Sequence, residues 1–283
     1  MNIIKKIYLL YFSKYGKIYS LCNYFFSYIM AYKIHSNNKE KFVKIKKKLN
    51  NNDYKIINIA KKISEYGYYK TNLKDIGFDD TVLDTIDKYK NETGKKTNKF
   101  FFNNLYNYSF NDELSRFSTS ENFMKIASIY LNIFPIINNI QIIKSDIADD
   151  QQYYSSMNWH LDKHHEKLIK VMILPYDLNS DDGPTCFLDK KVSKEIINND
   201  SHFSSPIYFK DEELLSADLK YKNKINEFTG KRGDILFIDT SKCLHMGSRC
   251  RKIRFQLFIT YTPILTYDIN TLKSLNTFKQ LNS

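Results

Sequence analysis

The hydrophobic pattern of this 283-residue chain changes its period at Pro135. Before Pro135, apolar residues recur at three- and four-residue spacing, which predicts helices over Ile56–Glu65, Thr81–Tyr89 and Ser120–Phe134. After it, short β-rich runs between polar turns predict strands at Ile140–Lys144, Ser156–His160, Leu168–Leu174, Thr185–Leu188, Ile235–Ile238 and Ile253–Thr262. We therefore expect an α+β protein in which an α-helical N-terminal region packs against a β-barrel or sandwich.

Some boundaries of these segments can be placed. Gly67 follows the first predicted helix and is expected to stop it. Ser120 is a candidate N-cap of the third helix, and Pro135 is expected to end that helix. The polar stretches Asn37–Asn52 and Asn91–Asn98 are expected to form a solvated connection and a loop.

The expected organisation is an N-terminal helical extension, 1–52, followed by one domain over 53–283. Within that domain, 53–135 is the helical front and 136–283 the β-rich core. The core contains a polar insertion, 190–228, which is too long for an ordinary hairpin loop and is expected to act as a lid or a binding segment.

The N-terminal residues 3–34 carry apolar side chains at helical spacing. A helix packed on the main domain is expected, with a membrane-surface helix as a second interpretation. Lys14, Lys17 and Asn23 interrupt the apolar run, so neither a transmembrane span nor a signal peptide is expected. The four cysteines form no CxxC pair, which favours free thiols in a reducing cytoplasm.

The net charge of +12 ordinarily indicates a polyanionic partner. The chain is also rich in Asn, Ile, Tyr and Phe, as an A/T-rich coding bias would produce, so much of the lysine is expected to be solvated surface. Arginine is scarce, and four of the five arginines lie within 232–254. This clustering suggests that a planar, bidentate donor is needed there.

A candidate metal site is formed by His160, Asp162 and His245. The first two make an HxD unit at the end of a predicted strand, where residues i and i+2 share a face. His245 follows a later strand and turn. Two imidazoles and one carboxylate leave three open positions on an octahedral ion, the arrangement found in non-haem Fe(II) oxygenases. Zinc is the competing metal, although it more often takes a closed tetrahedral shell.

Arg254 is the candidate anchor for a cosubstrate. It shares one face of the last predicted strand with Gln256 and Thr260. A buried arginine cannot shed its charge and needs an anionic partner, which a carboxylate would supply in bidentate geometry. Lys170 and Thr185 are further candidates for cosubstrate contact, with a surface lysine and an ordinary strand threonine as the alternatives.

Residues next to these candidates receive lesser roles. His164 and His165 are second-choice ligands, expected to lie past the end of the strand. Arg249 and Arg251 are expected to be solvated loop charges, with contact to an anionic substrate group as the second interpretation. Trp159 is expected to pack in the core rather than to form a platform for substrate.

From about Phe123 to Pro263, these motifs resemble the phytanoyl-CoA dioxygenase-like branch of the Fe(II)/2-oxoglutarate-dependent oxygenases. The resemblance rests on the helix ending IYLNIFP, the WHLD motif, KVMILPYDLNSDDGP, GKRGDILFIDTSKCLHMGSR, and Arg254 before FQLFITYTP. It implies a double-stranded β-helix of the jelly-roll, cupin-like kind. It also implies Fe(II) bound by His160, Asp162 and His245, with 2-oxoglutarate held by Arg254 and O2 as the oxidant.

The activity implied by this resemblance is hydroxylation of an unactivated C–H bond in a small-molecule or acyl substrate, with release of succinate and CO2. Related halogenases lack the metal carboxylate, whereas this chain retains Asp162, so hydroxylation is favoured over halogenation. Two alternatives stay open: a non-catalytic β-barrel protein that binds polyanions through its basic surface, and a zinc-dependent hydrolase. The sequence contains no recognised nucleic-acid motif, so no nucleic-acid partner is expected.

Overall fold

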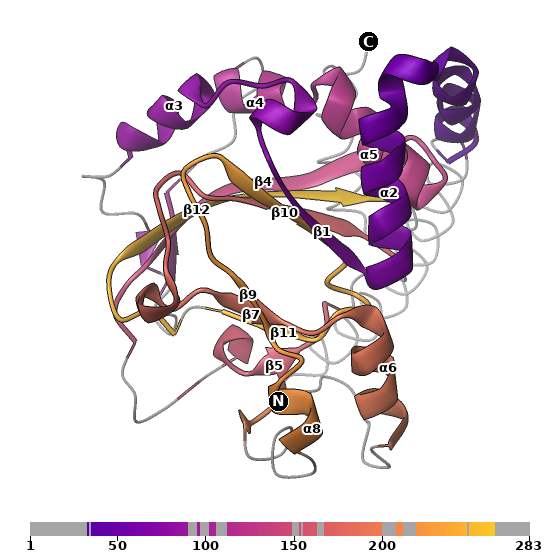
Figure 1. Cartoon of the computed structure of the whole chain (residues 1–283). Helices are drawn as coiled ribbons and strands as arrows, with labels where there is room; N and C mark the ends of the chain where they lie inside the picture. The colour runs from indigo at the N-terminus through magenta and orange to yellow at the C-terminus, as the bar shows by residue number, and fades with distance from the viewer. Residues whose placement is uncertain are drawn as a thin grey trace, which may run out of the picture.

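The computed structural model describes residues 33, 35–89, 95–96, 102–105, 112–148, 153, 155–162, 167–199, 208–211, 219–247 and 249–263. In these residues, two antiparallel sheets lie face to face and helices cover the outer side of the larger one (Figure 1). The arrangement confirms the expected combination of a helical front and a β-rich core. The helix and membrane-surface contact expected within 3–34 fall on residues that, apart from residue 33, lie outside the described ranges.

The larger sheet has the strand order β1-β10-β6-β12-β4-β3-β2. Its strands are β1 (Tyr68–Asn72), β10 (Asp234–Ile238), β6 (Ile169–Ile173), β12 (Arg254–Thr262), β4 (Ile136–Ser145), β3 (Phe102–Asn104) and β2 (Lys95–Lys96). The longest pairing joins β12 to β4, with Arg254 opposite Ser145. Because side chains alternate along a strand, β12 directs Leu257 and Ile259 toward the helices and Arg254 and Phe258 toward the smaller sheet.

The smaller sheet has the order β8-β5-β11-β7-β9. Its strands are β8 (Tyr208–Phe209), β5 (Trp159–His160), β11 (His245–Met246), β7 (Thr185–Phe187) and β9 (Asn226–Phe228). Between β4 and β7, and again between β9 and β12, successive core strands alternate between the two sheets. This path makes β11 a neighbour of both β5 and β7, so segments far apart in the sequence meet on one inner surface.

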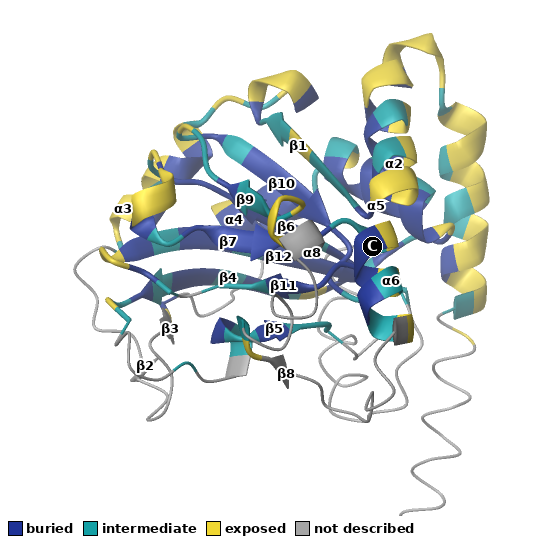
Figure 2. Cartoon of the chain, turned by 60° about the horizontal axis from the view of Figure 1, so that its bottom comes forward, coloured by how far each residue is buried: buried dark blue, intermediate teal, exposed yellow. Residues whose placement is uncertain are grey.

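The helical front packs on the outer face of the larger sheet through one apolar cluster, which includes Ile63, Phe123 and Ile259. Figure 2 shows these sheet and helix faces as buried. The helices are η1 (Asn51–Asp53), α2 (Tyr54–Tyr66), η2 (Lys74–Ile76), η3 (Thr81–Leu83), α3 (Asp84–Asp87), α4 (Glu113–Ser118) and α5 (Glu121–Leu131). As expected, Gly67 ends α2: it has φ 87, and its N–H donates to the Ile63 carbonyl at 2.8 Å.

Several predicted boundaries were wrong. Residues 35–48 are helical, whereas most of this stretch was expected to be a solvated connection. Lysine is a good helix former, and Asn38 is buried with its side-chain amide donating to the Phe134 carbonyl at 3.0 Å. By contrast, Ser120 is the N-cap residue of α5, as expected, although its side chain makes no capping hydrogen bond. That helix ends at Asn132, which is left-handed with φ 59, before Pro135 is reached.

The β-rich half contains short elements that the hydrophobic pattern did not indicate. β5 has only two residues because Ser155–Met157 forms the 3-10 helix η4, and η5 (Ser180–Asp182) precedes β7. The predicted insertion contains α6 (Lys190–Asn199), β8, α8 (Leu219–Lys222) and β9. Val192 and Ile196 of α6 pack with Trp159 and Leu244, so part of this segment supports the smaller sheet. Its action as a lid stays a prediction.

Two further expectations concern cysteines and membranes. Cys186, Cys243 and Cys250 are free thiols, as expected, and Cys22 lies outside the described residues. None of the described helices has the length and apolar character needed to cross a membrane.

Candidate metal centre

The structure brings His160, Asp162 and His245 together. His160 in β5 and His245 in β11 are direct partners in the antiparallel pairing, and their ring centroids lie 4.2 Å apart. Asp162 follows β5, and its backbone N–H donates to the Thr240 carbonyl at 2.9 Å. One ligand atom from each of the three residues lies within 4.8 Å of the others. The group has the residue types and spacing needed to hold one metal ion.

Backbone carbonyls orient both imidazoles. Nδ1 of His160 lies 2.8 Å from the Asn158 carbonyl, and Nδ1 of His245 lies 3.1 Å from the Cys243 carbonyl. Because a carbonyl only accepts hydrogen bonds, each Nδ1 carries the proton and each Nε2 lone pair is directed toward Asp162. The Nε2 atoms lie 3.9 and 3.8 Å from its carboxylate oxygens. Hydrogen bonds from a histidine to a backbone carbonyl fix the tautomer that binds a metal.

Burial keeps these imidazoles neutral. It lowers the pKa of His245 to about 3 and also lowers the pKa of His160. Burial alone would raise the pKa of Asp162, but the charge of Lys170 and hydrogen bonds from Lys170 and Thr240 hold it well below its usual range. At neutral pH the site therefore has two neutral nitrogen donors and one carboxylate, the protonation states that metal binding requires.

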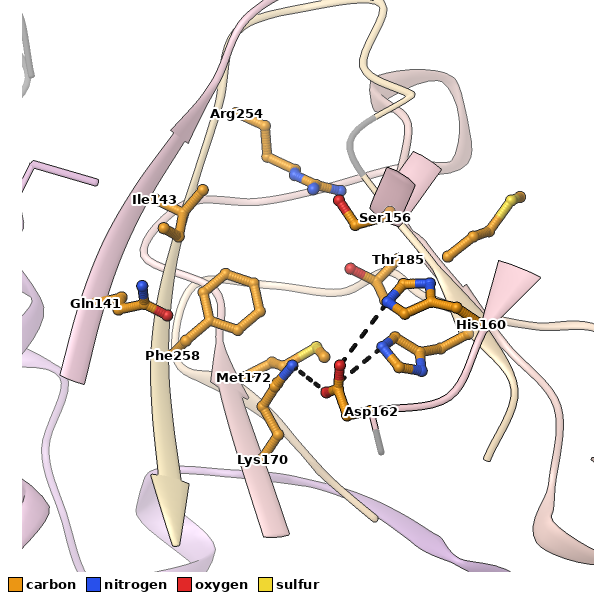
Figure 3. Close-up of a pocket in the computed structure, with 13 residues that line it drawn as sticks. Gln141, Ile143, Ser156, His160, Asp162, Lys170, Met172, Thr185, Arg254 and Phe258 are labelled. Atoms are coloured by element: carbon orange, nitrogen blue, oxygen red, sulfur yellow. Dashed lines mark hydrogen bonds and ion pairs between the residues drawn. The ribbon is translucent and has the colours of Figure 1, made fainter. Parts of the chain in front are cut away.

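A cavity of about 260 Å³ opens between the sheets at this group. Figure 3 shows His160 and Lys170 pointing toward Asp162, with Arg254 and Phe258 around the same space. The remaining lining residues are Gln141, Ile143, Ser156, Met172, Thr185, His245, Met246 and Gly247. Of the two orientations considered for Lys170, the inward one is present, and its ammonium contacts Asp162 at 2.6 Å. Thr185 also faces the cavity and is buried.

Arg254 reaches this cavity from the start of β12. Its side chain is buried, Nη1 donates to the Gly183 carbonyl, and Nε has no hydrogen-bond partner among the described residues. Burial lowers its pKa, yet a guanidinium stays charged in proteins. Gly183 has φ 73, and a Cβ there would lie 2.2 Å from the Arg249 carbonyl oxygen. Only glycine allows the turn to approach so closely and present its carbonyl to Arg254.

Arg249 has a different role from the one expected. It is not a solvated loop charge: its Nε donates to the Met157 carbonyl at 2.7 Å, and Nη1 pairs with Asp211 at 2.5 Å. Asp211 also accepts from the Trp159 indole at 3.0 Å, which confirms Trp159 as a buried packing residue. Arg251 is exposed, as expected.

Arg232 is also structural, since its Nη1 and Nη2 donate to the carbonyls of Pro175 and Asp80. The arginine cluster noted in the sequence thus serves separate sites. His164 and His165, the second-choice ligands, lie outside the described residues.

Thr240 is a site residue that the sequence pattern did not reveal. It follows β10, and its hydroxyl donates to Oδ2 of Asp162 at 2.6 Å. The turn that holds it is fixed by Asp239, which is fully buried and accepts hydrogen bonds from the Ser241 backbone and the Tyr130 hydroxyl. The only sequence signal was its place in the GDILFIDTSKCLH block, before His245.

Comparison with known proteins gives a likeness in structure alone. No protein-family model matches the sequence, and no curated protein matches it. The epimerase SnoN in complex with Fe3+, alpha ketoglutarate and nogalamycin RO matches with 10% identity and a TM-score of 0.50, over 73% of this chain and 83% of that one. EctD from S. alaskensis in its apoform gives 15% identity and a TM-score of 0.48, over 72% and 75% of the two chains.

HygX from Streptomyces hygroscopicus with nickel, 2-oxoglutarate and hygromycin B bound matches with 10% identity and a TM-score of 0.47, over 74% of this chain and 87% of that one. At such identities, the match to SnoN shows a shared fold. The chain described here therefore shares the fold of that epimerase.

Proposed function

We propose that this protein is an Fe(II)- and 2-oxoglutarate-dependent dioxygenase that hydroxylates a C–H bond of a small-molecule substrate. The observation that carries the proposal is the meeting of His160, Asp162 and His245 in a cavity that Arg254 also lines. The alternation of core strands between two sheets supports a double-stranded β-helix. The motifs within 123–263 support the phytanoyl-CoA dioxygenase-like branch of these enzymes.

The donor set fits a ferrous ion. His160 and His245 would bind it through Nε2 and Asp162 through its carboxylate, because both Nδ1 atoms are engaged by backbone carbonyls. Two imidazoles and one carboxylate on one side of an octahedral ion leave positions for other ligands. When bound, iron would supply the redox chemistry by which O2 converts 2-oxoglutarate to succinate and CO2 and oxidises the substrate.

Arg254 is proposed to hold the distal carboxylate of 2-oxoglutarate. A buried guanidinium with an unpartnered Nε is costly unless an anion completes its hydrogen bonds. No carboxylate of the described residues does so, and a dicarboxylate in the cavity would. Thr185, whose side chain faces the same space, is proposed to add a hydrogen bond to the cosubstrate.

The remaining wall of the cavity is suited to excluding water. Ile143, Met172 and Phe258 line it with apolar surface on the side of the larger sheet. A dry wall strengthens the electrostatic contacts that orient the bound molecules and protects reactive species from solvent. Because Asp162 occupies the position that halogenases leave open for halide, hydroxylation is the proposed reaction.

Anaerobic titration with Fe(II), followed by 2-oxoglutarate, tests the proposal. One iron should bind per chain, and 2-oxoglutarate should then produce a weak visible charge-transfer band. His160→Ala and His245→Ala should each lose this band and weaken iron binding. His35→Ala, at a histidine that lines a separate cavity, is the matched control and should bind as the parent does. Iron affinity unchanged in both site variants would refute the ligand assignment.

A further inference from the structure

The two carboxylate oxygens of Asp162 have different surroundings. Oδ2 accepts a hydrogen bond from the Lys170 ammonium and another from the Thr240 hydroxyl, each at 2.6 Å. Oδ1 lies 3.9 Å from Nε2 of His160. Nε2 of His245 lies 3.8 Å from Oδ2, which is too long for a hydrogen bond. The protein therefore holds the carboxylate by Oδ2, whereas Oδ1 accepts no hydrogen bond from the described residues.

Two separate elements supply the donors to Oδ2. Lys170 lies in β6, and Thr240 follows β10, the neighbouring strand of the larger sheet. The hydroxyl of Thr240 is fully buried, and the ammonium of Lys170 is mostly enclosed by the cavity. A carboxylate oxygen offers about two lone-pair sites, so two short donors use the capacity of Oδ2. Oδ1 keeps its lone pairs for another ligand.

We infer that Lys170 and Thr240 are positioning residues that restrict Asp162 to binding the metal through Oδ1 alone. The inference rests on the proposed function, because it concerns how the same metal is held. A carboxylate that chelated through both oxygens would occupy a fourth position of an octahedral ion. Restricting it to one oxygen keeps three positions for a cosubstrate that chelates through two atoms and for dioxygen.

This role differs from the one that the sequence suggested for Lys170, which was direct contact with the cosubstrate. The carboxylate of Asp162, rather than the open cavity, is the partner of its ammonium. The charge also has a consequence for affinity. A cation that donates to the metal-binding carboxylate competes with the metal for its electron density, so removing Lys170 should tighten metal binding. The backbone carbonyls that accept hydrogen bonds from His160 and His245 act in the opposite sense, because they raise the basicity of the imidazoles.

Mn(II) is a suitable probe, because the water-proton relaxation that it causes reports how many water molecules it binds. In the parent, three protein ligands leave about three water positions. Lys170→Met should free Oδ2 to join the metal, which lowers the bound-water contribution by about one third. The same titration should show Mn(II) affinity at least about tenfold higher, since an adjacent positive charge has been removed.

Thr240 provides a variant that leaves the charge unchanged. Thr240→Val removes one donor to Oδ2 while keeping the shape of the side chain, and it should lower the bound-water contribution without the gain in affinity. Thr240→Ser retains a hydroxyl and should behave as the parent does. If Lys170→Met does not fold, the two Thr240 variants test the inference by themselves.

Three outcomes separate the explanations. If Lys170→Met and Thr240→Val keep the parent's bound-water contribution, the inference is overturned while the proposed function stands. If Lys170→Met keeps the parent's bound-water contribution but weakens 2-oxoglutarate binding to the Mn(II) protein, Lys170 is a cosubstrate ligand, as first expected from the sequence. If the parent binds no Mn(II) or Fe(II) at these residues, the proposed function itself fails.

Discussion

Replacement of Arg254 by lysine should weaken 2-oxoglutarate binding by at least about tenfold and leave metal affinity nearly unchanged. Nη1 of Arg254 already donates a hydrogen bond to the Gly183 carbonyl, and its buried Nε has no partner among the described residues. The guanidinium can therefore offer a carboxylate two parallel donors while staying anchored. A lysine at the same position has a single nitrogen and no planar fork to match the carboxylate.

The magnitude follows from the hydrogen bonds that would be lost. A hydrogen bond to a charged group contributes about 1.5–3 kcal/mol. Loss of one bond of the bidentate pair thus corresponds to roughly tenfold or more, since about 1.4 kcal/mol is a factor of ten in affinity. Lysine must also satisfy the Gly183 carbonyl in a site where the side chain is only 5% exposed. Competition between that carbonyl and the carboxylate should increase the loss.

The assay is anaerobic titration of the Fe(II)-loaded protein with 2-oxoglutarate, followed by the charge-transfer band, together with a separate Fe(II) titration. Arg232→Lys is the matched control. Arg232 is also a forked arginine, with donors on the carbonyls of Pro175 and Asp80, but it does not line the cavity. That control should lose stability and keep its 2-oxoglutarate affinity. If Arg254→Lys binds 2-oxoglutarate as the parent does while Arg249→Lys does not, the anchor is misassigned.

The remaining predictions concern stability. Because burial lowers the pKa of His245 to about 3, the unfolded chain binds a proton that the native metal-free protein does not as the pH falls below about 6.5. The free energy of unfolding should fall by up to about 1.4 kcal/mol per pH unit for this histidine between pH 6 and 4.5. Urea titrations at several pH values measure this fall, and the free energy of unfolding of His245→Asn should depend correspondingly less on pH. Gly77→Ala should cost about 1–2 kcal/mol, the price of a left-handed conformation at φ 81. Gly67→Ala should cost roughly 2 kcal/mol more, because its Cβ would lie 2.4 Å from Cys243 Sγ, and equal urea midpoints for the two alanine variants would contradict this contact.

The sequence was most informative where a pattern extended over many residues. The change of period at Pro135, the helix over 56–65 and the long strand that begins at Arg254 all follow from sustained alternation or helical spacing. The candidate metal-site residues could be predicted because His160 and Asp162 are close in sequence and His245 lies in a long motif block. The structure adds that these residues meet.

Details decided by tertiary contacts were less accessible. β11 has two residues and is too short to show a period, so its pairing with β5 depends on the path of the whole chain. Arg249 appeared to be a loop charge because its partner, Asp211, lies in a different part of the chain. The alternation of side chains along β6 did not show whether Lys170 points into the barrel or outward, since both faces of this strand are covered in this fold.

The pairing of β5 with β11 has a consequence for the order of events during synthesis. The strands that carry His160 and His245 become neighbours only after the chain has passed through β6, β7, β8, β9 and β10. Strands that are far apart in the sequence pair slowly and late, because the entropy of closing a long loop is lost before any contact between the strands offsets it. A nascent chain that has emerged as far as β10 holds His160 and Asp162 without their third partner. Under the proposed function, capture of a metal by the complete triad would therefore follow the closing of the smaller sheet and would not template the strands that precede it.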